Sequence, residues 1–231
     1  MKKVNIGCGY KKLEGYINVD VVADVQPDIL IESGQSVLAL LPSNEFDEVL
    51  ANDVLEHIPH SSTMNVLLDW AALLKPAGNL VLQTSLITGI VDIMRSRPCF
   101  ETEYNFMRCL FGFQAHHGDF HYTSFTKATL HTYLVAAGFH VPKFSVKDLW
   151  LISCVAEKVS DWRALADPDG DDANFVVESF RRILKRDVDE ASIDDYVSRL
   201  ASGELTRESV IRGLICAPEN LYKIGAELDA A

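Results

Sequence analysis

The sequence predicts an α/β fold, with a doubly wound and mostly parallel sheet, plus a small C-terminal all-α module. The chain has 231 residues, of which 48% are hydrophobic and 23% charged, as expected for a globular protein of one or two domains. Short β-like runs alternate with helical segments over the first two thirds of the chain, which indicates parallel strands joined by crossovers. The last third of the chain contains only amphipathic helical segments, and it is therefore predicted to be all helical.

The β-like runs give the order of the expected elements. Strands are expected at 3–6, 16–22, 28–31, 48–51 and 79–84, and two closing strands at 139–141 and 149–156. A helix should begin at 54–58, and the one-sided apolar stripe of 64–74 predicts a strong helix that the turn residues at 75–78 end. Residues 85–120 read as an inserted helical cap, and 126–137 as a helix that Gly138 ends.

A change in composition near residue 166 predicts a domain boundary. We expect one domain over 1–158, a linker over 159–172 that includes the acidic turn-forming stretch 166–172, and a helical module over 173–231. The module should contain three short helices, the third starting after an N-cap at Thr206 and ending at Pro218.

Charge and cysteine content limit the classes of partner. The net charge of −12 argues against a nucleic-acid partner, which would require a basic surface. No apolar run approaches the length of a membrane helix or of a signal-peptide core, so we expect neither membrane insertion nor secretion. Five cysteines without a C-x-x-C pattern are typical of a reduced, cytoplasmic protein without structural zinc.

A glycine turn carries the first functional signal. Gly7, Cys8 and Gly9 follow the first strand, where bare backbone lets a ligand approach closely. Polar residues follow the next three strands, at the same predicted edge of the sheet: Asp20, then Glu32 and Ser33, then Asn52 and Asp53. The glycine pair alone is equally consistent with a tight turn, but the set predicts a nucleotide-type site. The third glycine of the dinucleotide fingerprint is replaced by Lys12, which disfavours NAD.

These motifs resemble the class I S-adenosylmethionine-dependent methyltransferases, and in particular a short bacterial branch. The resemblance covers about residues 2–158 and rests on the segments 4–9, 15–20, 46–58, 74–78, 121–126 and 136–139. It implies a Rossmann-like methyltransferase fold that binds S-adenosyl-L-methionine. It also implies that Gly7, Cys8 and Gly9 contact the methionine moiety, that Asp20 binds the ribose, and that Glu32, Ser33, Asn52 and Asp53 complete the cofactor site.

The sequence departs from that family at its first crossover. Only residues 10–15 separate the glycine turn from the second strand, too few for a normal crossover helix, so about one turn is expected. The helix N-terminus that would face the cofactor carboxylate is then weakened, and Lys11 or Lys12 is expected to compensate. Because little sequence precedes the first strand, we expect residues 85–121 to exclude water from the site.

Two histidines are candidates for a general base, the role that histidine most often fills. His57 follows the fourth strand, and His121 lies just before the helix at 126–137. Alternatively, His57 only holds a loop. The histidine-rich stretch 116–121 could suggest a metal site, but its spacing matches no zinc signature, so we expect a polar loop gating the substrate and no metal. Cys8 is better explained as a small residue that the turn tolerates than as a nucleophile.

The C-terminal segment resembles a small uncharacterised bacterial helical domain that often accompanies polysaccharide-related modules. This resemblance implies an interaction or oligomerisation role, and the basic residues Arg181, Arg182, Lys185 and Arg186 are either a solvated face or a docking surface. The sequence thus predicts methyl transfer to a small-molecule or saccharide acceptor. A catalytically degenerate scaffold is the main alternative, and a metal-assisted hydrolase is a more distant one.

Overall fold

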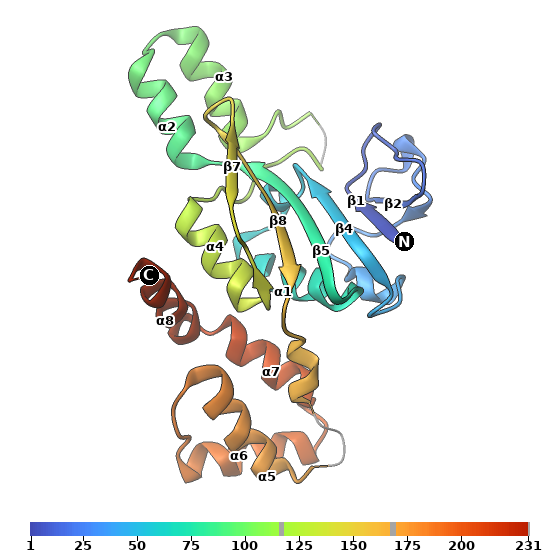
Figure 1. The fold of residues 1–231 in the computed structure, drawn as a ribbon, viewed down its shortest axis with the longest axis vertical. Helices are drawn as coiled ribbons and strands as arrows, with labels where there is room; N and C mark the ends of the chain where they lie inside the picture. Colours follow the sequence, from blue (N-terminus) through green and yellow to red (C-terminus); the bar gives the residue numbers. More distant parts are fainter. Residues whose placement is uncertain (116–117, 167–169, 231) are drawn as a thin grey trace.

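The computed structural model describes residues 1–115, 118–166 and 170–230. In these ranges the chain forms one eight-stranded sheet in the order β3-β2-β1-β4-β5-β8-β6, with β7 also paired to β8 (Figure 1). The strands are β1 (Lys3–Ile6), β2 (Tyr16–Asp20), β3 (Ile29–Leu30), β4 (Phe46–Asn52), β5 (Leu74–Ser85), β6 (Phe139–His140), β7 (Phe144–Lys147) and β8 (Leu151–Lys158).

The direction of the strands places the candidate site. Strands β3, β2, β1, β4 and β5 run parallel, so their carboxyl ends meet at one edge of the sheet. Strand order reverses around β1, which is paired with β2 on one side and β4 on the other, and ligands of open α/β sheets bind at such a switch point. Strand β8 is antiparallel to β5, β6 and β7 and completes the sheet on the far side.

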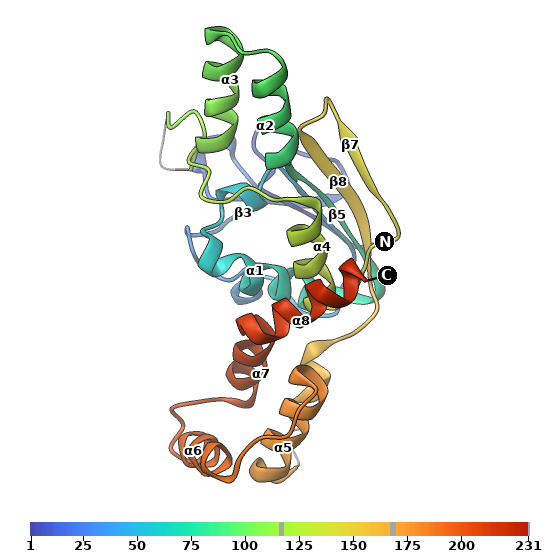
Figure 2. The same cartoon turned by 90° about the vertical axis from the view of Figure 1, so that its left-hand side faces the viewer.

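Two helices, α1 (His60–Leu73) and α4 (Lys127–Ala136), pack on one face of the sheet, as Figure 2 shows. Helix α1 buries Leu67 and Trp70 in the core. Helix α4 begins at a capping box between Thr126 and Thr129, and Gly138, with φ of 93°, follows its end as the sequence predicts. Val155, on the opposite side of the sheet, is 51% exposed.

The predicted helical cap is a hairpin of two helices, α2 (Ile87–Ser96) and α3 (Phe100–Phe111). It projects beyond the carboxyl edge of the parallel strands, at the top of Figure 1. Helix α2 is anchored by the buried Ile90 and Ile93, whereas α3 buries no residue. The hairpin therefore stands at the same edge of the sheet as the glycine turn.

The C-terminal segment is all-α, as predicted. It contains the 3-10 helix η4 (Trp162–Leu165), α5 (Asp172–Ser179), the π-helical turn η5 (Phe180–Leu184), α6 (Glu190–Ala201), α7 (Arg207–Cys216) and α8 (Pro218–Asp229). The expectation of three helices was wrong, because α8 is a fourth. Pro218 does not merely end α7: it occupies the first turn of α8, where its missing N–H has no helical partner to lose.

Two local expectations on the sheet domain also need correction. Residues 54–58 do not begin the next helix: they hold the separate 3-10 turn η3 (Leu55–His57), and α1 starts after Pro59. Strand β7 was not predicted. It lies at the periphery of the sheet, where Ser145, Val146 and Lys147 are exposed, so it lacks the apolar run that marks a buried strand.

The predicted fold class, a mostly parallel α/β sheet followed by an all-α module, is confirmed. Residues 10–15 join β1 to β2 without the single helical turn that was expected, and residues 75–78, expected to form a turn, belong to β5. The domain boundaries remain a prediction. Within the expected linker, Trp162 is buried and its indole N–H donates to the carbonyl oxygen of Leu68 in α1, at 3.2 Å.

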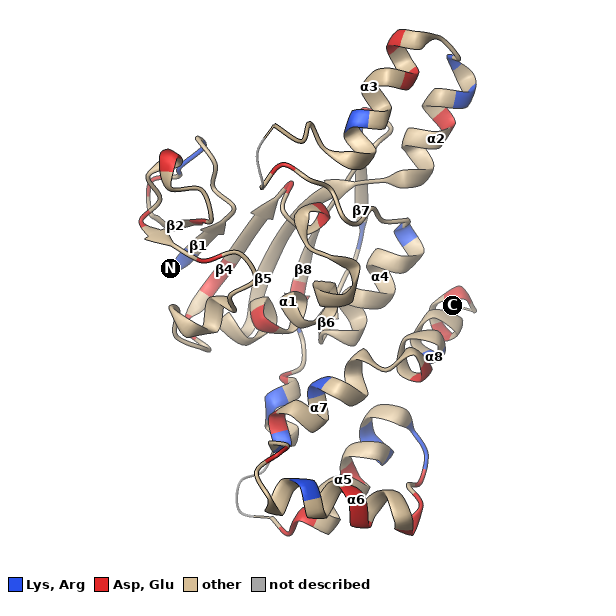
Figure 3. Cartoon of the chain, turned by 180° about the vertical axis from the view of Figure 1, so that it is seen from behind, with Lys and Arg blue, Asp and Glu red and all other residues tan. Residues whose placement is uncertain are grey.

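Basic and acidic residues lie interspersed along the C-terminal helices (Figure 3), and the expected basic patch is largely neutralised: Arg181, Arg182 and Arg186 each pair with a carboxylate of the module.

We predict that Lys158→Met destabilises the fold by about 2–4 kcal/mol. The buried Lys158 ammonium donates to the carbonyl oxygen of Leu74 at 2.8 Å, the side-chain oxygen of Asn44 at 3.0 Å and the carboxylate of Asp161 at 3.1 Å. Chemical denaturation measures the loss. Lys147→Met, an exposed lysine on β7, is the matched control, and an equal effect of both substitutions would contradict the prediction.

Candidate active site

The turn after β1 has the backbone that the sequence predicts. Gly7 and Gly9 have φ of +64° and +50°, in the left-handed region that glycine adopts without strain. Gly7 has a second reason to be glycine, since a Cβ there would lie 2.5 Å from Cγ2 of Val54. At Gly9 nothing lies within 4 Å of such a Cβ. A side chain is thus excluded at Gly7 by Val54 but has room at Gly9, and the main chain itself is exposed at Gly7 and partly exposed at Gly9.

Asp20 lies beside this turn and holds it. One carboxylate oxygen accepts from the backbone N–H of Gly9 at 2.7 Å, and the other from that of Val22 at 2.9 Å. The residue is only 8% exposed. Each carboxylate oxygen has a further lone pair, so the group is oriented yet still able to accept from two hydroxyls.

Buried amides replace the missing crossover helix. The Asn5 side chain donates to the Asn18 side-chain oxygen at 3.0 Å and to the carbonyl oxygen of Lys11 at 3.2 Å. Asn18 in turn accepts from the backbone N–H of Leu13 and donates to Asp28. The pKa of Asp28 is lowered by these bonds from Asn18. The loop from Gly9 to β2 therefore has a fixed path without helical hydrogen bonds.

A cavity of about 170 Å³ opens next to the turn. Its lining comes from the β1 turn and from the ends of β4 and β5: Asn5, Gly7, Cys8, Lys11, Leu13, Leu50, Asn52, Asp53 and Gln83. The structure therefore brings four of the predicted residues, Gly7, Cys8, Asn52 and Asp53, to one cavity. Asp53 has φ of +57°, and its carboxylate accepts from the side-chain amide of Gln83 at 3.1 Å and 3.2 Å.

The structure separates the two lysines that the sequence left open. Lys11 lines the cavity, and in the part of the chain that the structure describes no carboxylate pairs with it. The ammonium of Lys12 instead donates to the carbonyl oxygen of Gln26, at 3.0 Å. Lys11 is therefore the residue available to neutralise an anionic group in the cavity.

The other four predicted residues, Gly9, Asp20, Glu32 and Ser33, do not line the cavity. Gly9 and Asp20 are bonded to each other next to Cys8, whereas Glu32 and Ser33 lie exposed on a turn after β3, one strand beyond Asp20. The turn follows Ile31, whose backbone N–H donates to the carbonyl oxygen of Asp20 at 3.0 Å. Their positions are compatible with contacts to the far end of an elongated ligand, on the other side of Asp20 from the cavity.

The two candidate bases lie in contact. The rings of His57 and His121 meet edge to face, with centroids 4.6 Å apart. The Nδ1 atom of His57 lies 3.0 Å from the carbonyl oxygen of Phe120, and Nδ1 of His121 lies 2.8 Å from that of Cys109. A carbonyl only accepts, so Nδ1 carries the hydrogen in both rings, and Nε2 of a neutral ring is left to accept a proton.

Backbone pairing explains how residues 64 positions apart in the sequence meet. The backbone N–H groups of Tyr122 and Thr123 both donate to the carbonyl oxygen of Glu56, and the Thr123 hydroxyl donates to that of Ile58. Burial, followed by the neighbouring His121, lowers the pKa of His57. His57 is therefore uncharged at neutral pH and able to act as a base.

Glu56, which the sequence analysis did not single out, is a buried acid beside this pair. It is 3% exposed, and its carboxyl group accepts from the hydroxyl of Thr84 in β5 at 2.8 Å. Burial raises its pKa to about 7. A glutamate between the apolar Leu55 and Ile58 was a possible signal, but only the tertiary structure shows that it is buried.

Neither metal nor thiol chemistry gains support here. In the described ranges no group of three or more His, Cys, Asp or Glu residues could hold a metal ion, and His116 and His117 lie outside those ranges. Cys8 is buried, and burial raises the pKa of its thiol, which disfavours the thiolate that a nucleophile requires.

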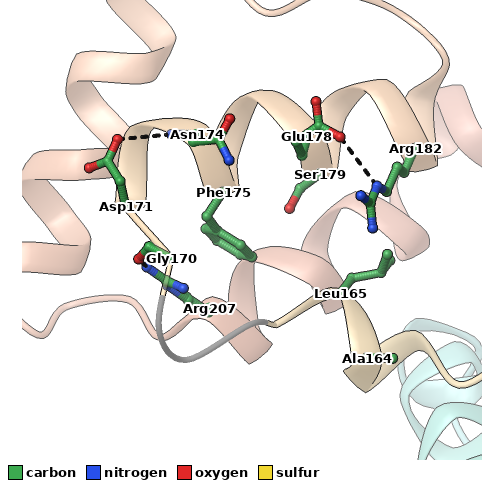
Figure 4. Close-up of a pocket in the computed structure, with 10 residues that line it drawn as sticks. All are labelled: Ala164, Leu165, Gly170, Asp171, Asn174, Phe175, Glu178, Ser179, Arg182 and Arg207. Atoms are coloured by element: carbon green, nitrogen blue, oxygen red, sulfur yellow. Dashed lines mark hydrogen bonds and ion pairs between the residues drawn. The ribbon is translucent and has the colours of Figure 1, made fainter.

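A second cavity, of about 180 Å³, lies in the C-terminal module (Figure 4). It is lined by residues of η4, α5, η5 and α7: Ala164, Leu165, Gly170, Asp171, Asn174, Phe175, Glu178, Ser179, Arg182 and Arg207. Its two arginines already pair with carboxylates, Arg182 with Glu178 and Arg207 with Asp172. The cavity beside the glycine turn is therefore the better candidate for a functional site.

The sheet domain, with its glycine turn after β1 and its carboxylate at the end of β2, has the fold of a solved methyltransferase. A S-adenosylmethionine-dependent methyltransferase from Methanosarcina mazei is 18% identical, with a TM-score of 0.50 over 68% of this chain and 92% of that one. The 1,6-didemethyltoxoflavin-N1-methyltransferase of Burkholderia thailandensis, crystallised with S-adenosylhomocysteine, is 18% identical, with a TM-score of 0.46 over 68% and 71%.

The C-terminal module matches a different family. Residues 162–224 match a domain of unknown function, DUF4214. The match begins at Trp162, inside the segment expected to be a linker. Comparison with curated proteins finds no match. The chain therefore combines a methyltransferase fold with a helical domain whose role is not defined by its family.

In the described residues no helix is long and apolar enough to span a bilayer.

We predict that Glu56 makes stability depend on pH. Its folded-state pKa of about 7 lies above that of an unfolded glutamate, so the folded state binds the extra proton. The free energy of unfolding should then fall by about 3 kcal/mol as pH rises from below 4.5 through 7.

Glu56→Gln, which keeps the shape without the titration, should flatten this dependence. Thermal unfolding between pH 5 and pH 8 tests it, with the exposed Glu101→Gln as control. An unchanged slope in Glu56→Gln would contradict the prediction.

Proposed function

We propose that this chain is an S-adenosylmethionine-dependent methyltransferase acting on a small-molecule or saccharide acceptor. The observation that carries the proposal is the oriented carboxylate of Asp20, which accepts from the partly exposed Gly9 main chain next to a cavity lined by Lys11; among the residues that the structure describes, no carboxylate pairs with Lys11. The methyltransferase fold, shared with the Methanosarcina mazei protein, supports the proposal.

The residues present fit the parts of S-adenosylmethionine. Asp20 would accept the ribose hydroxyls, and the turn with Glu32 and Ser33 would flank the adenine. The Gly7–Cys8–Gly9 main chain, with Asn52 and Asp53, would hold the methionine moiety, and Lys11 would neutralise its carboxylate. When bound, the cofactor supplies an electrophilic methyl group on a sulfonium.

The contribution of the chain is position and proton transfer. In-line displacement requires the acceptor nucleophile to be held opposite the leaving sulfur, and such positioning accounts for much of the rate. Nε2 of His57 or His121 would remove the acceptor proton, because Nδ1 of each ring is engaged with a carbonyl. The α2–α3 hairpin and the segment after it would limit the access of water.

Charge and cysteine chemistry support the rest of the proposal. An acidic chain is a poor partner for nucleic acid, which favours a small acceptor. All five cysteines are unpaired, as in a reducing compartment, so we place the protein in the cytoplasm. The exposed Tyr222 on α8 is compatible with a homo-oligomer or protein partner at the C-terminal helices.

Cofactor binding tests the proposal directly. Titration calorimetry should show that S-adenosylhomocysteine binds, and Lys11→Met should weaken binding by about ten- to a hundredfold, since a hydrogen bond to a charged group contributes about 1.5–3 kcal/mol. The neighbouring Lys12→Met is the matched control, because the Lys12 ammonium is engaged with Gln26. Absence of binding by the folded wild-type protein would refute the function.

The histidine pair should matter for turnover and not for binding. We expect His57→Gln or His121→Gln to lower kcat by about 10²-fold or more on a hydroxyl or amine acceptor, with unchanged affinity for S-adenosylhomocysteine. Because the pKa of His57 is lowered, the wild-type rate should hold through neutrality and decline only below about pH 6.5. Turnover can be followed as S-adenosylhomocysteine release across sugar and small-molecule acceptors. Cofactor binding without turnover on any of them would favour a degenerate scaffold instead.

A further inference from the structure

A buried carboxylate in α1 joins the C-terminal module to the sheet domain. Asp69 is 7% exposed, and each of its oxygens has one partner. Oδ1 accepts from Nη2 of Arg212 in α7 at 2.5 Å, and Oδ2 accepts from the hydroxyl of Ser36 at 2.5 Å. One carboxylate therefore bridges a helix of the module and the loop that follows β3.

The module holds Arg212 rigidly in this contact. The guanidinium lies 4.6 Å from the ring centroid of Trp162, a favourable cation–π distance, and also pairs with Glu208. Trp162 is itself buried and bonded to α1 through the carbonyl of Leu68. Both Trp162 and Arg212 belong to the segment 162–224 that matches the separate family.

Ser36 carries the contact toward the candidate cofactor site. Its hydroxyl also accepts from the backbone N–H of Leu38 and so caps the 3-10 helix η2 (Val37–Ala39). The preceding turn is closed by two bonds between Glu32 and Gln35. At its other end, Ile31 is bonded to the backbone of Asp20. The exposed turn 32–35 is thus held at its two ends, by Asp20 and by Ser36.

We propose that Arg212 and Asp69 are positioning residues, through which the C-terminal module fixes the turn 32–35 beside Asp20 and thereby sets the affinity for the adenosine end of the cofactor. The affinity part rests on the proposed function. Without Arg212, the buried Asp69 carboxylate retains only a hydroxyl donor, and a buried charge without its partner is strongly unfavourable. The carboxylate must then shift toward water, and this change alters its bond to Ser36.

Two substitutions and one control test the proposal on the full chain. Arg212→Met removes the pairing, and Ser36→Ala removes the other end of the contact. Arg199→Met is the control, because Arg199 pairs with Glu204 on the module surface, away from α1. Hydrogen exchange of the segment 31–38 reports the order of the turn, and calorimetry with S-adenosylhomocysteine reports affinity.

We expect faster exchange in residues 31–38 and about five- to tenfold weaker S-adenosylhomocysteine binding in Arg212→Met and in Ser36→Ala, with neither change in Arg199→Met. The double variant should lose little more than the more affected single variant, because both act on one contact. Arg212→Lys, which keeps the charge but not the planar fork, should restore part of the affinity, and it replaces Arg212→Met if that variant fails to fold.

Unchanged exchange and affinity in the Arg212 and Ser36 variants would overturn the proposal, as would equal effects in Arg199→Met. The exchange measurement requires no cofactor. If the wild-type protein binds no S-adenosylhomocysteine, the proposed function fails while exchange still decides whether the module orders the turn.

Discussion

The glycine turn after β1 depends on side chains, because no helix follows it to hold its path. In a usual crossover, helical hydrogen bonds and packing against the sheet would fix the main chain. Here Asp20 accepts from the N–H of Gly9, and the buried amides of Asn5 and Asn18 hold the next residues. A polar network of this kind is stabilising only when all its members are satisfied. In the described residues no buried side-chain nitrogen or oxygen lacks a partner.

The same network explains how the site can be open yet ordered. Asp20 is rigid because both its oxygens are bonded to backbone N–H groups, which leaves the remaining lone pairs for a ligand. Lys11 is the one cation of the loop that lines the cavity, since Lys12 is engaged elsewhere. In the proposed site, the charge of Lys11 would take the place of the helix dipole that a full crossover would aim at an anion.

The C-terminal module is part of this arrangement and packs against the sheet domain. Helix α8 packs against α4, α7 contacts α1, and the Trp162 indole is bonded to α1. The basic residues that the sequence left open as a solvated face or a docking surface form ion pairs within the module. The contact of the module with the sheet domain lies instead at α1. Through Asp69 and Ser36, that contact reaches the loop after β3.

The local pattern of residues in the sequence determined much of the secondary structure of this protein. Strand alternation, the cap at Thr126 and the glycines after β1 are set by short-range chemistry, so the sequence alone predicted the α/β order, the shortened crossover and the edge that bears Asp20, Asn52 and Asp53. Strand β7 was missed because it is largely exposed at the periphery of the sheet and lacks a buried apolar run. Helix α8 was missed because Pro218, which was expected only to end α7, stands in the first turn of α8. The pairing of His57 with His121, the burial of Glu56 and the bridge from Arg212 to Ser36 were decided by tertiary structure, because each depends on contacts between residues far apart in the chain.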